Sequence, residues 1–219
     1  MPARVHALLV VRSDADLWHL ERTLDALAAQ DYPVDALTIV SCGTASGPAQ
    51  SLIATSAAEG VITAPRHASF AQALRLATHR IAIAHTPATE HADDTVWLLA
   101  HDSTPEPDAL RLLIGALETH SSATIVAPKL VERTAPDRIV SLGVTMTQLG
   151  RSVHLVDGFL DQGQYDHLED ALGADIRGML VRRTAWDVLN GIDPALMGTD
   201  EGLDLAIRAR LVGDRVTLV

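Results

Sequence analysis

Short apolar segments that alternate with helical patterns constrain the fold of this chain more than any other feature of its sequence. The first, residues 5–11, is an apolar run of the kind found in strands buried on both faces. Four more short apolar runs follow, at residues 37–40, 60–63, 95–100 and 123–127. Apolar side chains recur at helical spacing between these runs, over residues 17–27, 49–58, 69–84 and 107–118.

This alternation predicts an α/β fold with a mostly parallel sheet and helices on both of its faces. Ligands of such sheets bind beyond the carboxyl ends of the strands. We therefore expect a site in the loops after Val11, Val40 and Ala100. Asp14 is the expected N-cap of the first helix, because its carboxylate can accept hydrogen bonds from the first turn.

The second half of the chain has a different pattern. Two strand-like runs around Gly143 and Gly150 predict a hairpin or meander within residues 138–155. The polar segment 157–170 predicts a loop with a short helix. Further strands are expected at residues 178–183 and 214–219, and further helices at 184–190 and 200–211. Because the pattern ends within a strand, we expect a larger parent protein.

Composition excludes several classes of function. The chain has 219 residues and a net charge of -11, which argues against nucleic acid or an anionic membrane surface as the main partner. Cys42 is the single cysteine, so an internal disulfide is excluded and a reducing compartment is expected. The apolar run near residue 5 is too short for a signal peptide, and no apolar run approaches membrane-spanning length. The ten histidines show no metal-binding spacing.

Four segments, in order, resemble the segments of one known protein family. VHALLVVRSDADLWHLERTLDALAAQDYP is similar to the opening strand, helix and turn of that family. VWLLAHDSTPEPDAL resembles the segment with the metal-binding carboxylate, and GMLVRRTAWDVLNGIDPAL resembles the acceptor-side segment. DEGLDLAIRARLVGDRV resembles the segment that carries the family's Glu-Asp pair. Together the four segments resemble the family 2 glycosyltransferases, and the match covers nearly the whole chain.

The resemblance implies the GT-A fold, with a small acceptor-side subregion. It implies one domain over residues 1–219, with a nucleotide-binding half at 1–130 and an acceptor-side half at 131–219, truncated at its C-terminus. It also implies a nucleotide-sugar donor, linked to uridine or thymidine diphosphate, and a carbohydrate acceptor. There is no G-x-G-x-x-G segment and no P-loop to support an unrelated nucleotide-binding protein.

The family's metal-binding carboxylate corresponds to Asp102, which would also contact the donor. A divalent metal, Mn or Mg, would neutralise the charge that develops on the diphosphate. The preceding positions, acidic or amide in the family, are Ala100 and His101 here. His101 is a candidate ligand for Mn(II) and a poorer one for Mg(II). The alternative is that Asp102 caps the turn before Pro105 and that His101 is a loop residue.

The family's catalytic base corresponds to Gly202, which has no side chain to accept a proton. Glu201 falls on the Glu of the family's pair, and Asp204 on its later Asp at the acceptor side. Asp200 and Glu201 are the candidates to replace the missing base. Alternatively, both simply favour a helix N-terminus, where negative charge is stabilised.

The family's nucleotide-binding acids correspond to Ser41 and Ser46, while Gly43 is kept and allows a tight turn. Ser41 offers a hydrogen bond but no charge. Arg12 is a further candidate contact, with an ordinary surface cation as the alternative. Cys42 has no recognisable His partner, which argues against a nucleophile.

At the acceptor side, Arg182 and Arg183 match the family's basic pair, and one of them is expected to clamp a diphosphate. A surface ion pair is the alternative. Trp186 matches a family aromatic at the acceptor side, with a core residue as the alternative.

Two functions remain open. The first is a glycosyltransferase that transfers a sugar from a nucleotide-diphosphate donor to an acceptor hydroxyl with inversion. The second is a catalytically impaired pseudo-glycosyltransferase that binds or scaffolds within a larger, membrane-associated polypeptide. In it the metal would be lost. Either would lie in the cytoplasm or at the cytoplasmic face of a membrane.

Overall fold

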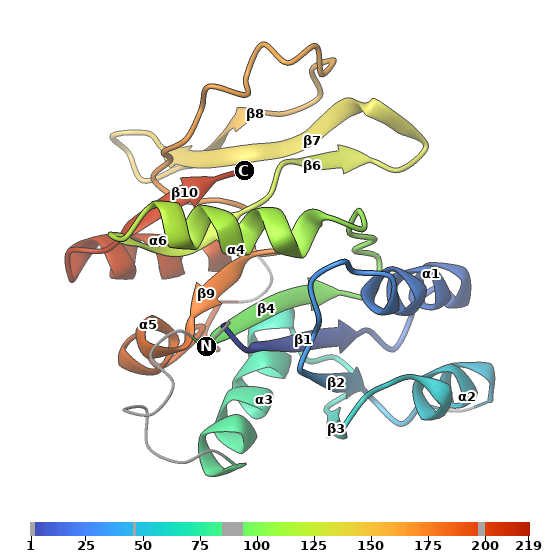
Figure 1. Cartoon of the computed structure of the whole chain (residues 1–219). Helices are drawn as coiled ribbons and strands as arrows, with labels where there is room; N and C mark the ends of the chain where they lie inside the picture. The colour runs from blue at the N-terminus through green and yellow to red at the C-terminus, as the bar shows by residue number, and fades with distance from the viewer. Residues whose placement is uncertain (1–2, 46, 85–93, 197–199) are drawn as a thin grey trace.

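The computed structural model describes residues 3–45, 47–84, 94–196 and 200–219, with the backbone alone over 79–84. Its centre is a seven-stranded sheet in the order β10-β5-β9-β4-β1-β2-β3 (Figure 1). The strands are β1 (Val5–Val11), β2 (Ala36–Cys42), β3 (Gly60–Ala64), β4 (Thr95–Ala100), β5 (Ala123–Ala127), β9 (Leu180–Arg182) and β10 (Arg215–Leu218). All neighbouring pairs are parallel except those of β9, which runs antiparallel to β4 and β5.

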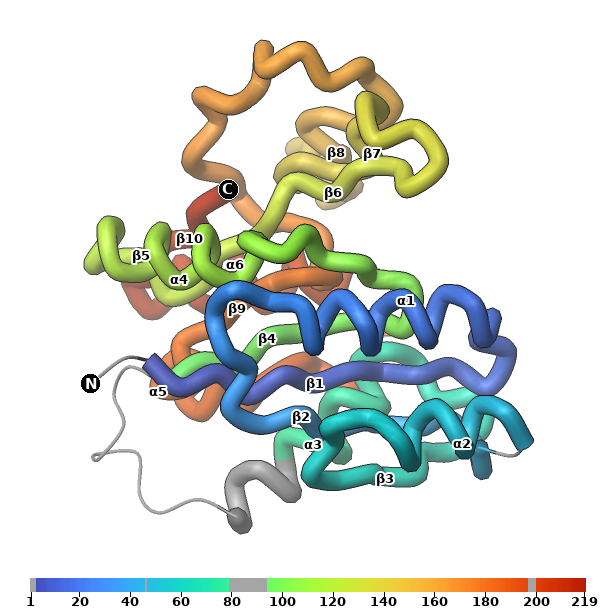
Figure 2. Tube along the Cα trace, turned by 45° about the vertical axis from the view of Figure 1, so that its right-hand side comes forward, coloured from blue at the N-terminus to red at the C-terminus, as the bar shows by residue number. Residues whose placement is uncertain are grey.

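Helices cover both faces of this sheet, as Figure 2 shows. They are α1 (Leu17–Ala28), α2 (Pro48–Thr55), α3 (Phe70–Ala84), α4 (Ala109–Thr119), α5 (Arg183–Val188) and α6 (Glu201–Leu211). Alternate residues of β1 serve two cores, since Ala7 and Leu9 pack with α1, α2 and α4. Leu8 and Val10 pack on the other face with α3, α5 and α6. Because β1 is buried on both faces, apolar residues occur on both sides of the strand rather than at every second position.

A second, three-stranded antiparallel sheet lies beside the large one, in the order β6-β7-β8 (Figure 1). Its strands are β6 (Leu130–Glu132), β7 (Ala135–Met146) and β8 (Ser152–Val156). Ile139, Leu142 and Val156 join it to the core that contains α3, α5 and α6. Gly150 lies in the β7–β8 turn at φ +80°, so the expected hairpin is confirmed.

The structure confirms a mostly parallel α/β sheet and corrects three local expectations. Asp16, rather than Asp14, caps α1, because its carboxylate accepts a hydrogen bond from the Trp18 amide at 2.8 Å. β6 was not expected from the sequence, since three residues are too few for a clear pattern. The segment 157–170 contains loop and turn but no α-helix. Among the described residues, no helix is long and apolar enough to cross a membrane.

Candidate functional site

A crevice of about 950 Å³ opens at the carboxyl edge of the large sheet. The segments after β1, β2 and β4, the β3–α3 connection, the loop before β9 and the start of α6 all contribute to it. Its charged or reactive lining residues are Arg12, Asp14, Cys42, Arg66, His67, His101, Asp102, His154, Asp175, Arg177, Asp200 and Glu201. The crevice therefore lies where a parallel α/β sheet places its ligand.

Asp102 and His101 enter the crevice from the turn that follows β4. Asp102 is exposed, and the turn is closed instead by Ser103, whose hydroxyl accepts a hydrogen bond from the Ala100 amide at 3.1 Å. The backbone of His101 is fixed, because its amide donates to the Val10 carbonyl at 3.0 Å. Burial lowers the pKa of the His101 imidazole, while the neighbouring Asp102 charge partly opposes this. Asp102 thus lines the crevice, and Ser103 closes the turn in its place.

These residues do not by themselves form a metal centre. Nowhere in the described part of the chain do three or more His, Cys, Asp or Glu side chains gather in a metal-binding group. Asp102 contributes one carboxylate, and the Nδ1 atom of His101 is enclosed without a hydrogen-bond partner. Hard divalent cations prefer several oxygen ligands, so this donor set does not fit an ion held by the protein alone.

Arg12 lies at the end of β1 in an exposed ion pair with Asp14, at 3.0 Å between Nε and Oδ1. The hydrogen bond with Asp14 raises the pKa of Arg12, and the charge of Asp102 adds a smaller increase. Asp14, which does not cap the helix, therefore orients a cation at the crevice. An exposed pair contributes little to stability, which leaves Arg12 available to a ligand.

The segment after β2 places its residues differently from the expectation. Ser41 is buried and donates a hydrogen bond to the Gly43 carbonyl at 3.1 Å, and it does not line the crevice. Gly43 adopts φ +84°, consistent with the tight turn that its lack of a side chain allows. Cys42 lines the crevice instead, and burial raises the pKa of its thiol. Ser46 lies outside the described residues.

The start of α6 brings Asp200, Glu201 and Gly202 to the crevice. Asp200 is exposed and adopts a left-handed conformation at φ +60°, whereas Glu201 is buried. Gly202 lies so close to the loop of residues 173–178 that a Cβ atom there would be 2.2 Å from the Ala174 carbonyl oxygen. A side chain at position 202 is sterically excluded, so the missing carboxylate is part of the packing.

Asp204, on the same helix, does not line the crevice. Its carboxylate forms an ion pair with Arg208 at 2.7 Å. Arg208 also donates hydrogen bonds to the Leu189 and Gly191 carbonyls, at 2.7 and 3.0 Å. Asp204 therefore positions a cation that ties α6 to the end of α5, and its acceptor-side role stays a prediction.

Arg182 and Trp186 lie at the opposite, amino edge of the sheet. β9 is antiparallel, and its register pairs Arg182 with Thr95, the first residue of β4. The guanidinium of Arg182 donates hydrogen bonds to the Leu117 and Ala123 carbonyls. Trp186 is fully buried in the core, at 0% exposure. Both positions are remote from the crevice, in contrast to the acceptor-side placement expected from the sequence.

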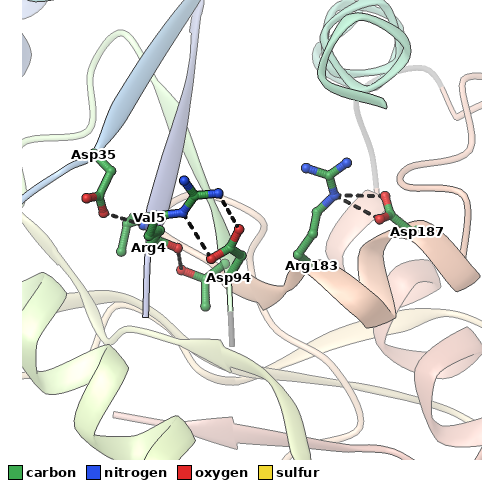
Figure 3. Close-up of polar contacts among 7 residues, drawn as sticks. Arg4, Val5, Asp35, Asp94, Arg183 and Asp187 are labelled. Carbon is green, nitrogen blue, oxygen red and sulfur yellow. Dashed lines mark hydrogen bonds and ion pairs between the residues drawn. The ribbon is translucent and has the colours of Figure 1, made fainter. Parts of the chain in front are cut away.

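Arg183 belongs to the same amino edge, as Figure 3 shows. It forms an ion pair with Asp187 at 2.9 Å, and its amide donates to the Asp94 carbonyl at 2.7 Å. In the same view Arg4 pairs with Asp94 at 3.1 Å. Arg183 thus takes the ion-pair alternative.

Sequence reasoning missed several crevice residues, namely Arg66, His67, His154, Asp175 and Arg177. Asp175 and Arg177 precede β9, and residues before a strand belong to the carboxyl edge only if that strand is antiparallel. The alternation of strands and helices predicts parallel strands, so it gave no signal for this pair. His154 comes from β8 of the small sheet, whose position over the crevice is a tertiary feature.

A mostly parallel sheet with helices on both faces and a charged crevice at its carboxyl edge agrees with the GT-A fold of glycosyltransferases, whose solved structures match this chain. Residues 4–219 match the model of glycosyltransferase like family 2, and the chain belongs to this family. A sequence comparison with curated proteins found no match.

Solved structures support the same fold. GalNAc-T7, solved with UDP, GalNAc and Mn2+, superposes with a TM-score of 0.71 at 10% identity, over 99% of this chain and 42% of that one. TarS residues 1–349 from S. aureus, solved with UDP, gives 0.62 at 11% identity, over 99% and 57%. The mannosyltransferase PcManGT from Pyrobaculum calidifontis, with GDP-Man and Mn2+, gives 0.61 at 14% identity, over 100% and 57%. The chain therefore spans about half the length of these proteins.

Proposed function

We propose that the crevice binds a nucleotide-diphosphate sugar and that the chain transfers this sugar to an acceptor hydroxyl with inversion. The observation that carries the proposal is the meeting of Asp102, Asp200 and Glu201 in one crevice, from segments far apart in the sequence. Proteins of the same fold were solved with UDP, UDP-GlcNAc and GDP-Man. A uridine- or thymidine-linked donor and a carbohydrate acceptor follow as the partners.

In this proposal Asp200 is the general base. Its carboxylate is exposed to the crevice, two positions before the residue that corresponds to the family's base. A non-glycine residue at φ +60° is uncommon and costs energy, which is typical of positions held for function. Glu201 is buried beside Asp200. In this proposal it would hold the start of α6, and with it the carboxylate of Asp200, in place. Asp102 would lie next to the donor diphosphate, together with any divalent ion that the diphosphate brings.

A second candidate function is donor binding without transfer. The observation that favours it is the sealed position of Gly202, where the protein has no room for the family's base. The domain would then bind a nucleotide sugar, or scaffold, within a larger polypeptide in the cytoplasm or at a membrane's cytoplasmic face. Binding and turnover measured separately distinguish the two functions.

The first experiment titrates the chain with uridine, thymidine and guanosine diphosphates by calorimetry, with Mn(II) and with a chelator. Turnover is then measured as release of the nucleoside diphosphate from its sugar donor in the presence of mixed oligosaccharide acceptors. We expect Asp200→Asn to lower turnover by about 100-fold or more, the usual contribution of a general base, with little change in nucleotide affinity.

Asp187→Asn is the matched control, because Asp187 pairs with Arg183 at the amino edge. We expect this variant to retain turnover. Product stereochemistry, read by NMR at the anomeric carbon, tests inversion. Nucleotide binding without any turnover would replace the transferase proposal by the binding-only function, and the lack of binding to every nucleotide would contradict both.

A further inference from the structure

The loop of residues 173–178 lines part of the crevice and is fixed by backbone hydrogen bonds to its neighbours. Gly173 exchanges two backbone hydrogen bonds with Val144 of the small sheet, at 2.7 and 2.9 Å. A Cβ atom on Gly173 would lie 2.8 Å from Leu203 Cα, and one on Gly202 would lie 2.9 Å from the Ile176 amide nitrogen. Two glycines, one on each side, therefore let this loop and α6 pack backbone against backbone.

This loop presents a preorganised guanidinium. Arg177 is held by Asp175 through Nε to Oδ1 at 3.0 Å and Nη2 to Oδ2 at 2.7 Å. The backbone amide of Arg177 also donates to Asp175 Oδ1, at 2.9 Å. A bidentate pair of this kind fixes the plane of the guanidinium. The Nη1 group of Arg177 donates to none of the residues that the structure describes, so it remains available to a ligand in the crevice.

Arg177 precedes β9 and the predicted donor contact Asp102 follows β4, and these two strands are neighbours that open on the same crevice. The Gly178 amide donates to the Leu98 carbonyl at 2.8 Å, and the Leu98 amide donates to the Met179 carbonyl at 2.9 Å. The end of β4 and the start of β9 therefore lie side by side at the carboxyl edge. The hydrogen bonds of Asp175 raise the pKa of Arg177 against the effect of burial, and the charge of Asp102 raises it further.

A diphosphate in this crevice would meet Asp102 at close range. Two like charges repel, so the site needs a cation close to Asp102. The donor set around Asp102 does not complete a metal centre among the described residues, whereas Arg177 supplies a permanent positive charge on a rigid loop. A planar guanidinium also matches the geometry of phosphate oxygens.

We propose that Arg177, positioned by Asp175, binds the diphosphate of the donor, so that nucleotide binding does not require a divalent metal. The proposal rests on the proposed function, because it needs a nucleotide diphosphate in the crevice. In this arrangement Gly202 has a positive role. Because Gly202 has no side chain, the loop that carries Arg177 can pack against the start of α6. This contact occupies the position where other members of the family have their catalytic base.

The test measures the affinities of uridine diphosphate and of uridine by calorimetry, in chelator and in Mn(II). The variants are Arg177→Gln, Arg177→Lys and Arg4→Gln. Arg4 is the matched control, because it forms a two-bonded pair with Asp94 at the amino edge. Thermal melting of each variant records whether the fold is retained.

We expect the unaltered chain to bind uridine diphosphate equally in chelator and in Mn(II). Arg177→Gln should weaken this binding by about 10- to 100-fold, as expected for a charge-assisted hydrogen bond, and leave uridine binding unchanged. Arg177→Lys should recover part of the affinity, and Arg4→Gln should bind like the unaltered chain.

Three results would overturn the inference. Binding of uridine diphosphate only in Mn(II), unchanged in Arg177→Gln, would assign the charge to a metal and leave the proposed function standing. Equal weakening of uridine and uridine diphosphate, or a large fall in melting temperature, would show that Arg177 is structural. The absence of uridine diphosphate binding under both conditions would contradict the inference and the uridine-linked donor together. If another nucleoside diphosphate binds instead, the same variants are tested with that nucleotide and its nucleoside, and the same results would overturn the inference.

Discussion

The two edges of the large sheet carry the same kinds of charged pair in different surroundings. At the amino edge, Arg4 pairs with Asp94 and Arg183 pairs with Asp187 around the ends of β1, β4 and β9 (Figure 3). At the carboxyl edge, the Asp175–Arg177 pair lines a crevice that also holds Asp102 and Asp200. Pairing therefore does not mark a functional residue. What distinguishes the carboxyl edge is that its charges converge on space large enough for a ligand.

The comparison gives opposite expectations for substitutions at the two edges. Residues of the amino edge should affect the free energy of unfolding and leave nucleotide binding intact. Residues of the carboxyl edge should affect binding or turnover, except where they hold the loop of residues 173–178 in place.

The largest expected effect is at Trp186, which the sequence suggested as an acceptor-side aromatic. Its side chain is fully buried, and Gly191 packs against its ring, where an added Cβ would lie 3.0 Å from Cζ2. We expect Trp186→Ala to lower the free energy of unfolding by about 3–5 kcal/mol, from lost burial and the cavity left behind. Urea unfolding measures this change.

Trp186→Phe is the control for the same position, because it keeps most of the apolar volume. We expect a smaller loss of stability and an unchanged KM for the acceptor. A raised KM in Trp186→Phe, with stability retained, would place this residue at the acceptor site and break the contrast between the edges.

The second largest effect is expected at Gly202, where α6 packs against the backbone of the loop of residues 173–178. We expect Gly202→Asp, which restores the family's carboxylate, to cost about 3 kcal/mol of stability, because the added Cβ would clash with backbone rather than with a movable side chain. Chemical unfolding would again report the loss.

Gly115→Asp on α4 is the matched control, because nothing lies within 4 Å of a Cβ there. We expect a change of about 0.5 kcal/mol or less for this variant. A Gly202→Asp protein that is as stable as the unaltered chain and more active would show that the loop can yield, and that position 202 is open to a base.

The smallest effect concerns Asp170, which contacts Arg210 and also pairs with Arg215 at 3.1 Å near the start of β10. Burial raises the pKa of Asp170, but the hydrogen bonds from these two arginines outweigh it, so the pKa lies below its ordinary value. We expect Asp170→Asn to cost about 0.5 kcal/mol at neutral pH, because the carboxylate is well exposed to solvent.

The sign of its pH dependence follows from the lowered pKa. The carboxylate's contribution to stability is complete above the pKa of the unfolded chain and is lost as the pH falls through the folded-state pKa. Unfolding curves of the two proteins should therefore differ at pH 7 and converge in strong acid. A difference in the free energy of unfolding that grows in acid would contradict the lowered pKa of Asp170. A change in nucleotide affinity in Asp170→Asn would contradict the contrast between the two edges.

Much of the fold was predictable because burial leaves a periodic record in the sequence. The strands β1, β4 and β5 begin and end where the apolar runs do, since strands covered by helices on both faces must be apolar. The order of the four family-like segments predicted the GT-A class, which the family match and the solved structures confirm. The turn after β4 was predicted for the same reason, because it directly follows a strand whose six residues are all buried.

The candidate site was less predictable, because the apolar pattern of a strand does not show in which direction the strand runs. The direction decides which edge of the sheet the residues before and after the strand reach. The segment GMLVRR reads as a strand in either direction, and only its pairing shows that it runs antiparallel to β4. That reversal places Arg182 at the amino edge and brings Arg177 to the crevice. Likewise, Ser41 and Cys42 are the last two residues of β2, and of the two Ser41 is buried away from the crevice while Cys42 lines it.

The sequence alone determined the layered α/β architecture, the family and the absence of a side chain at position 202. The tertiary structure decided what that absence means. Gly202 is where α6 and the loop of residues 173–178 meet backbone to backbone, a contact between segments that local sequence patterns do not relate. Hydrophobic periodicity specifies which residues are buried, but steric fit between distant segments decides which charges share a crevice.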